Sequence, residues 1–234
     1  MSWKIPRIWE GGECWIIGGG QSMCKQFGIP HKIVQSVMKG ESKPDVYSPY
    51  LSAIHKEHVI GINMSFQIGN WIDIMFFGDG SYFLNNKNQL AEFPGLKVCC
   101  DPKVKKYDWI KMVDRDLNKP RGLSSILGKV SWNGNSGAAA INFAVHLGCK
   151  KIMLLGFDMK LTEKNQQHWH NLYGRQSRLD DPKDKKIRNL PFDKHLRGFP
   201  FILEDAKKLG VEIINVNPDS AIECFRKVNL SDVL

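Results

Sequence analysis

Short, continuously apolar runs recur along this chain, with room for a helix or a long loop between them. Runs of this length are typical of strands that are buried on both faces of a parallel sheet. Two helical patterns, 136–147 and 198–209, each end just before a glycine, which is a common helix stop. The sequence therefore predicts an α/β fold, a Rossmann-like doubly wound and mostly parallel sheet with its functional residues at the carboxyl ends of the strands. The predicted strands lie at 14–18, 58–63, 74–78, 96–100, 151–157 and 211–216.

The segment 160–197 interrupts this alternation and is predicted to be a lid or binding segment, because it is polar and too long for an ordinary loop. A second irregular loop is expected at 38–52. Residues 160–200 carry ten Lys and Arg against five Asp and Glu, in a chain of net charge +9. Such a surface attracts phosphate on a nucleotide, a nucleic acid or a membrane, although a merely solvated basic face is an equal alternative. The 234 residues suit one domain, 1–234, that includes this lid.

Several classes of protein are disfavoured by what the sequence lacks. No apolar run approaches the ~20 residues that a membrane-spanning helix needs, and the N-terminus has no apolar core of a secretory signal. The six cysteines include no C-x-x-C pair, so we expect reduced thiols. The expectation is a cytoplasmic protein with no membrane partner, of undetermined oligomeric state.

A glycine-rich turn follows the first predicted strand. Glycines there let the backbone approach a phosphate closely, and a helix N-terminus supplies amide donors. The spacing is not G-x-G-x-x-G, and Asn63 rather than an acidic residue ends the second strand, which disfavours a nicotinamide cofactor. We favour nucleotide or phosphate contact over a plain tight turn. The turn consists of Gly18, Gly19, Gly20, Gln21 and Ser22.

Polar residues end the next two predicted strands. The Asn63 carboxamide can donate to and accept from a base or a ribose, or it can simply cap a turn. Asp79 follows the third strand and can hold Mg²⁺ or a hydroxyl. Asp73 begins that strand at the opposite edge of the sheet, where a structural role is expected.

Two further groups of polar residues lie near the central helix and in the lid. Asn135, Ser136 and Gly137 open the helix; they can meet an anion, or Ser136 can serve as the N-cap. Asp158 follows the fifth strand, and His168 and His170 flank a tryptophan ten residues later. An extended H-x-H sends both rings to one side, as a general base with its neighbour or as two metal ligands. No further ligands stand nearby, so no metal site is predicted.

Four segments together resemble a known superfamily. It joins the MptE-like 6-hydroxymethylpterin diphosphokinases with small bacterial sialyltransferase-like glycosyltransferases. The third segment, which runs from the start of the central helix to the end of the fifth strand, is the most specific. One departure is visible, because Gln21 stands where the superfamily usually has proline. The segments are 16–22, 60–63, 135–158 and 214–220.

The resemblance implies roles for the residues that match. The turn 18–22 would touch the nucleotide phosphates, and Asn63 would contact the ribose or the donor sugar. Ser136 and Gly137 would lie near the base or a phosphate. A lid histidine, His168 or His170, would activate the acceptor hydroxyl. A closing segment would line the nucleotide site through Asn217 and Ser220.

These observations favour a nucleotide-sugar-dependent glycosyltransferase that needs no further cofactor. The alternative is a diphosphokinase that transfers diphosphate from ATP to a pterin-like alcohol, with Mg²⁺ held by Asp79 and Asp158. A second alternative is a non-catalytic nucleic-acid-binding protein. The basic lid, with Trp169 and Tyr173 interleaved, further predicts a polyanionic acceptor such as a modified base in DNA, because aromatic rings can stack on an exposed base.

Overall fold

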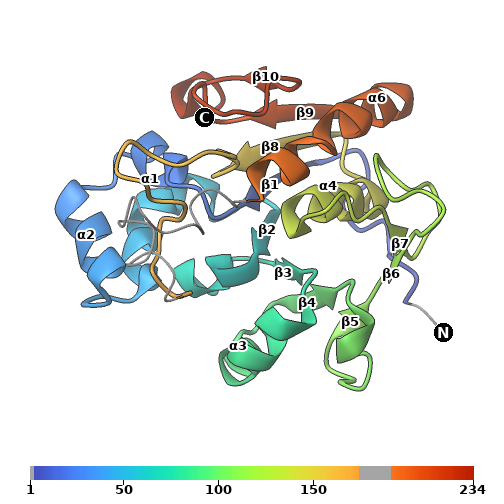
Figure 1. Cartoon of the computed structure of the whole chain (residues 1–234), viewed down its shortest axis with the longest axis horizontal. Coiled ribbons are helices and arrows are strands. Elements are labelled where there is room, and N and C mark those ends of the chain that lie inside the picture. The colour runs from blue at the N-terminus through green and yellow to red at the C-terminus, as the bar shows by residue number, and fades with distance from the viewer. Residues whose placement is uncertain (1–2, 174–190) are drawn as a thin grey trace.

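The computed structural model describes residues 3–173 and 191–234, and its centre is an eight-stranded sheet in the order β10-β9-β8-β1-β2-β3-β4-β5 (Figure 1). Every neighbouring pair in this sheet is parallel. The strands are β1 (Glu13–Ile17), β2 (Val59–Ile62), β3 (Ile74–Phe77), β4 (Leu96–Cys99), β5 (Lys111–Met112), β8 (Lys151–Leu155), β9 (Glu212–Asn215) and β10 (Arg226–Lys227). A separate parallel pair is formed by β6 (Asp114–Arg115) and β7 (Lys129–Val130).

The predicted α/β fold and its six predicted strands are confirmed. Four strands were not predicted, namely β5, β6, β7 and β10, and each is two residues long. Strands this short carry no apolar run, so nothing in the local pattern distinguishes them from loop. These four strands lie at the edges of the main sheet or outside it. The hydrophobic pattern therefore identified only the longer, central strands.

The helices confirm both predicted helical patterns and correct two details. Asn135, not Ser136, is the N-cap of α4, because its side chain accepts a hydrogen bond from the amide of Ala138 at 2.8 Å. The stretch 38–52, expected to be irregular, lies mostly in the 3₁₀ helix η1. The α-helices are α1 (Ser22–Gln26), α2 (His31–Lys39), α3 (Gly80–Glu92), α4 (Ser136–Leu147), α5 (Phe192–Leu196) and α6 (Phe199–Leu209). The 3₁₀ helices are η1 (Pro44–Ile54), η2 (Asn63–Ile68), η3 (Pro102–Val104) and η6 (Leu230–Asp232).

The sheet is covered on both faces, which makes it the middle of three layers. Along β1, Ile16 packs with α4 and α6, whereas Trp15 and Ile17 pack with α1, α2, η1 and α3. Because successive side chains of a strand point to opposite faces, both faces of the strand need apolar residues, and this explains the unbroken apolar runs. None of the helices in the described ranges is long and apolar enough to cross a membrane.

The parallel arrangement brings the carboxyl ends of β1, β2, β3 and β8 to one edge of the sheet. The predicted functional residues follow these ends. Asp73 lies at the opposite edge, where its carboxylate accepts a hydrogen bond from the amide of Val59 at 2.8 Å. The structural role expected for Asp73 is therefore confirmed.

Candidate functional site

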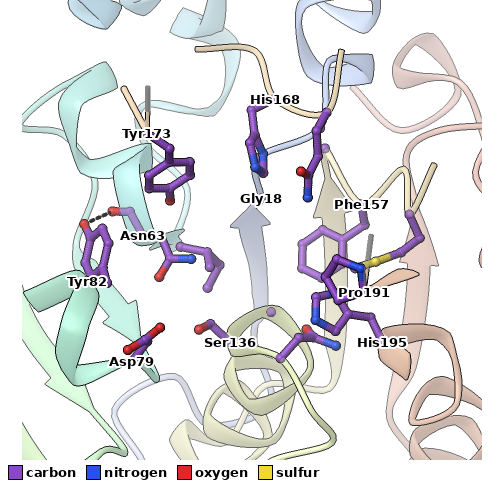
Figure 2. A pocket seen from close by; sticks show the side chains of 18 of the residues that line it. Gly18, Asn63, Asp79, Tyr82, Ser136, Phe157, His168, Tyr173, Pro191 and His195 are labelled. Atoms are coloured by element: carbon purple, nitrogen blue, oxygen red, sulfur yellow. Dashed lines mark hydrogen bonds between the residues drawn. The ribbon is translucent and has the colours of Figure 1, made fainter. Parts of the chain in front are cut away.

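A cavity of about 1020 Å³ opens at the carboxyl edge of the sheet (Figure 2). In the close-up, Asn63 and Tyr82 stand on one side, with Phe157, Pro191 and His195 across from them. Four predicted residues are not among those that line the cavity: Gln21, Ser22, Asn217 and Ser220. The predicted residues that do line it are Gly18, Gly19, Gly20, Asn63, Asp79, Asn135, Ser136, Gly137, Asp158, His168 and His170.

Three backbone amides of the glycine-rich turn donate hydrogen bonds to other parts of the protein. The amide of Gly18 donates to the carbonyl of Leu155 and that of Gly20 to the carbonyl of Gly156, each at 2.8 Å. The amide of Ser22 donates to a carboxylate oxygen of Asp158 at 3.0 Å. These three donors are therefore not available to a ligand phosphate, although Gly18, Gly19 and Gly20 line the cavity.

Asp158 occupies the place at the start of α1 where a bound anion was expected. Its carboxylate also accepts hydrogen bonds from the hydroxyl of Ser22 and, at 3.0 Å, from the side-chain amide of Asn217. A Cβ on Gly20 would lie 2.5 Å from the Asp158 carboxyl carbon, so this turn needs glycine to admit the carboxylate. Burial raises the pKa of Asp158, while the bonds from Ser22 and Asn217 act to lower it. The carboxylate thus joins three segments that are far apart in the sequence.

The closing segment of the chain supports the same corner from behind. The Ser220 hydroxyl donates to the carbonyl of Phe157 at 2.6 Å, and the amide of Ala221 donates to the carbonyl of Asp158 at 2.9 Å. Asn217 and Ser220 therefore hold the turn after β8 in place. The structure gives them a supporting position behind the cavity wall.

Asn63 presents an unused polar atom at the cavity. It adopts a left-handed backbone conformation with φ of 52°, which Asn tolerates better than most residues. Its carbonyl accepts a hydrogen bond from the Tyr82 hydroxyl at 2.7 Å. The side-chain Oδ1 is buried and has no hydrogen-bond partner among the described residues. Such an atom is costly unless a ligand or water satisfies it, so this position fits a donor group of a ligand.

The start of α4 is an anion-attracting feature of the cavity. The first amides of a helix lack intrahelical acceptors, and a helix of twelve residues carries partial positive charge at this end. Asn135 is only 8% exposed, and its Nδ2 has no partner within the described part of the chain. The Ser136 hydroxyl accepts from the amide of Gly78 at 3.1 Å. Both side chains line the cavity.

The two lid histidines lie on the same side of their segment, as the H-x-H pattern predicts. The rings of His168 and His170 stack, with centroids 5.2 Å apart and planes 3° from parallel. His170 is 2% exposed, and the amide of Leu172 donates to its Nδ1 at 3.2 Å. Burial, together with the neighbouring His168, holds the pKa of His170 well below its ordinary value. His168 is the more accessible of the two.

We expect His170 to make the protein less stable at mildly acidic pH. Its native pKa is below the unfolded value, so below about pH 6.5 the unfolded chain binds a proton that the native state refuses, and stability falls as pH drops. One such group costs at most about 1.4 kcal/mol per pH unit. Urea unfolding at pH 7.5 and 5.5 should show a smaller loss for His170→Gln than for the unchanged protein or for His31→Gln. Equal losses in all three would contradict this assignment.

Trp169 cannot stack on a base, contrary to the prediction. Its side chain is fully buried at 0% exposure. The indole Nε1 donates to the carbonyl of Gly18, and the Trp169 amide donates to the carbonyl of Gly19, both at 2.9 Å. The Tyr47 hydroxyl donates to the Trp169 carbonyl at 3.0 Å. The tryptophan therefore anchors the lid segment to the glycine-rich turn, and its ring packs in the hydrophobic core.

His195 is a cavity residue that sequence reasoning missed. It belongs to the short helix α5 and lines the cavity beside Pro191 (Figure 2). Burial, and to a lesser extent the charge of Lys194, lowers the pKa of His195. The described residues give its ring no hydrogen bond. No motif surrounds it, and its segment is brought to the cavity by packing near the start of α4, where Gly198 lies against Asn133 and Lys194 against Gly134.

Part of the predicted lid can be placed. Residues 160–173 run along the cavity, and 191–197 carry α5. Tyr173 packs edge-on against His168 and His170, with ring centroids 5.2 and 4.9 Å away. The basic lid was predicted to bind a polyanion, and four of its basic residues, Lys183, Lys185, Lys186 and Arg188, lie outside the described residues.

Comparison with known proteins gives a likeness of fold. No protein-family model matches the chain, and no curated protein matches it. The MAf glycosyltransferase from Magnetospirillum magneticum AMB-1 superposes with a TM-score of 0.56 at 13% identity, over 99% of this chain and 35% of that one. The sialyltransferase CstII from Campylobacter jejuni aligns in two structures. With cytidine-5'-monophosphate the TM-score is 0.48 at 15% identity, over 93% and 84% of the two chains; with CMP-3FNeuAc it is 0.45 at 13%, over 93% and 86%. The first likeness shows that this chain shares an α/β Rossmann-like fold with a known glycosyltransferase.

Proposed function

We propose that this protein is a glycosyltransferase that moves a sugar from a nucleotide-sugar donor to an acceptor hydroxyl. The observation that carries the proposal is the arrangement of unused polar atoms in the cavity. A helix start with the spare donor Asn135 Nδ2 attracts an anion, and the spare acceptor Asn63 Oδ1 fits a hydroxyl or amino donor. A nucleotide sugar carries both kinds of group. The fold shared with a glycosyltransferase supports the same conclusion.

The donor phosphate is assigned to the start of α4 rather than to the glycine-rich turn. Asp158 already satisfies the amide of Ser22, and a second anion beside that buried carboxylate would be repelled. Asn63 and Asp79 then receive the hydroxyl-bearing part of the donor. Asp79 is the N-cap of α3, where it accepts from the amide of Ser81 at 2.8 Å, and it is exposed at the cavity.

His195 is the group that we assign as general base. Its lowered pKa keeps the ring neutral at pH 7, as a base requires. The ring takes the proton from the acceptor hydroxyl while that oxygen attacks the sugar's anomeric carbon, and the bond from this carbon to the phosphate oxygen breaks. The leaving phosphate gains negative charge, which the α4 amides and Asn135 stabilise. His170 is buried and holds the amide of Leu172, so it supports His168 in the lid segment.

The diphosphokinase alternative gains no comparable support. It assigned Mg²⁺ to Asp79 and Asp158. Both carboxylate oxygens of Asp158 accept hydrogen bonds from Ser22, and one of them also accepts from Asn217, so binding a cation would dismantle this corner. We therefore retain that activity only as an outcome of the test below.

A thermal-shift screen over nucleotides and nucleotide sugars, with and without Mg²⁺, tests the proposal. A ligand at 100 times its Kd stabilises by about 2.7 kcal/mol, which raises the Tm of a chain of this size by about 5 to 10 °C. Asn63→Ala should weaken donor binding about tenfold, because the spare acceptor is lost. Asn88→Ala, which changes an exposed residue of α3 outside the cavity lining, is the matched control.

Two results would contradict the proposal. If no nucleotide or nucleotide sugar raises the Tm, the proposed donor site is wrong. A shift with ATP that requires Mg²⁺, followed by release of AMP, would identify the diphosphokinase instead.

A further inference from the structure

A dense group of lysines lies beside the cavity, on α3 and the η3 segment. Residues 80–111 contain six lysines and three carboxylates. The ammonium groups of Lys87 and Lys106 lie over the ring of Tyr107, at 4.8 and 5.4 Å from its centroid. Lys105 is exposed next to them. We call Lys87, Lys103, Lys105, Lys106 and Tyr107 the Tyr107 cluster.

The positive charge of the Tyr107 cluster is offset only in part, because the Lys103 charge acts on the nearby Asp101 carboxylate and helps to lower its pKa. None of its lysines takes part in the ion pairs found among the described residues. Of the nearby carboxylates, Asp101 is occupied by the amides of Gly80 and Lys103, at 2.8 and 2.9 Å. Asp108 and Glu92 are exposed. Other lysines are paired, as Lys151 of β8 is with Glu13 of β1 and Lys227 of β10 is with Glu223.

The Tyr107 cluster packs against the core, and its Lys87 belongs to the same helix, α3, as several residues that line the cavity. The ring of Tyr107 packs on Phe83 of α3 at 4.6 Å between centroids. The backbone of Gly80 approaches Lys103 so closely that a Cβ there would lie 2.9 Å from the Lys103 Cβ. The same helix lines the cavity through Tyr82 and Asn86, and Lys87 follows directly. Figure 1 shows α3 beside β4 and β5, at the edge of the sheet farthest from β10.

We propose that the Tyr107 cluster binds the sugar-phosphate backbone of a single-stranded nucleic acid, one nucleotide of which enters the cavity as the acceptor. Clustered lysines follow a phosphodiester backbone, and the Tyr107 ring holds two of them, Lys87 and Lys106, in place beside the core. A duplex would keep its bases stacked and out of reach of a cavity at the sheet edge. A membrane surface would call for inserted apolar side chains, and on the exposed face of α3 only Leu84, at 60% exposure, is of that kind in the described structure.

The acceptor part of this proposal rests on the proposed function, whereas the binding surface does not. Three phosphate contacts to a single strand give a slope of about −2 in the logarithm of the association constant against log salt. Affinity should therefore fall by roughly twentyfold between 50 and 200 mM salt.

Fluorescence anisotropy with a labelled 20-nucleotide single-stranded DNA tests the surface. The cluster variant carries Lys87→Glu, Lys105→Glu and Lys106→Glu. The control variant carries Lys39→Glu, Lys56→Glu and Lys207→Glu, which are exposed lysines on other elements, so both variants have the same net charge. We expect the cluster variant to bind at least tenfold more weakly than the control and to lose most of the salt slope. The thermal shift with a donor nucleotide should be equal in both variants.

Each other outcome overturns a defined part of the proposal. If both variants bind the DNA equally weakly, only the net charge of the protein matters. If the unchanged protein does not bind the DNA at 50 mM salt, the proposed binding surface is wrong. Binding to vesicles that contain phosphatidylserine, lost in the cluster variant while DNA binding persists, would identify a membrane surface instead. If the cluster variant loses DNA while no variant binds any nucleotide, the surface stands and the proposed donor site fails.

Discussion

Replacing Asp158 by alanine is expected to lower the Tm by about 6 to 12 °C. The change leaves the Ser22 amide, the Ser22 hydroxyl and the Asn217 side-chain amide without their shared acceptor in a buried site. Each unsatisfied buried donor costs about 1–3 kcal/mol, and relief of the buried charge offsets part of the sum, so we expect a net loss of about 3 kcal/mol. In a chain of this size that loss corresponds to the stated shift. Calorimetry or dye-based melting measures it.

Two comparisons isolate the role of the buried carboxylate. Asp219→Ala removes an exposed carboxylate that pairs with Lys25 at 3.2 Å, and should change the Tm by no more than about 2 °C. Asp158→Asn keeps an acceptor oxygen for Ser22 and should lose less than the alanine variant. If Asp158→Ala has the same Tm as Asp219→Ala, the Asp158 carboxylate does not hold this corner together.

The raised pKa of Asp158 also sets the sign of a pH effect. Between the unfolded value, about 3.9, and its higher native value, the native state keeps a proton that the unfolded chain has lost. The stability contributed by this group is therefore full below about pH 3.9 and declines as pH rises through the native pKa. Asp158→Asn should remove that decline.

The central strands could be predicted because burial on both faces gives each of them a continuous apolar run. The helices α4 and α6 could be predicted from their helical patterns and the glycines that follow them, whereas α3, the longest helix in the described residues, was missed. The start of α4 was predicted to within one residue, but the choice between Asn135 and Ser136 as cap depends on side-chain geometry. The left-handed backbone conformation of Asn63 could not be predicted from the hydrophobic pattern. Its position at the end of β2 was nevertheless enough to identify it as a candidate site residue.

The contacts of the glycine-rich turn could not be predicted from the local sequence. The sequence predicted that the glycines of the turn contact a phosphate; the structure shows in addition that the Ser22 amide donates to Asp158, which is 136 residues away. Nothing in the turn itself distinguishes a carboxylate of the same chain from a ligand phosphate. Trp169 was misassigned for the same reason, because its partner Gly18 is 151 residues away.

The residue with the largest expected effect on turnover, His195, had no motif to mark it. His195→Ala should retain nucleotide binding in the thermal-shift assay and lower the rate of donor hydrolysis about 10²- to 10⁴-fold, the usual contribution of a general base. The donor to use is the nucleotide sugar that gives the largest shift. Water then serves as the acceptor, so no acceptor need be known.

The pH profile separates a base from a residue that merely shapes the cavity. A base must be neutral, and burial lowers the pKa of His195, so kcat/KM of the unchanged protein should stay level down to below pH 6.5 and fall only in more acidic solution. The residual activity of His195→Ala should lack that fall. His31→Ala, exposed on α2, controls for loss of a histidine elsewhere. If His195→Ala keeps its turnover within threefold while His168→Ala or His170→Ala loses it, the base lies in the lid segment, where the H-x-H pattern first placed it.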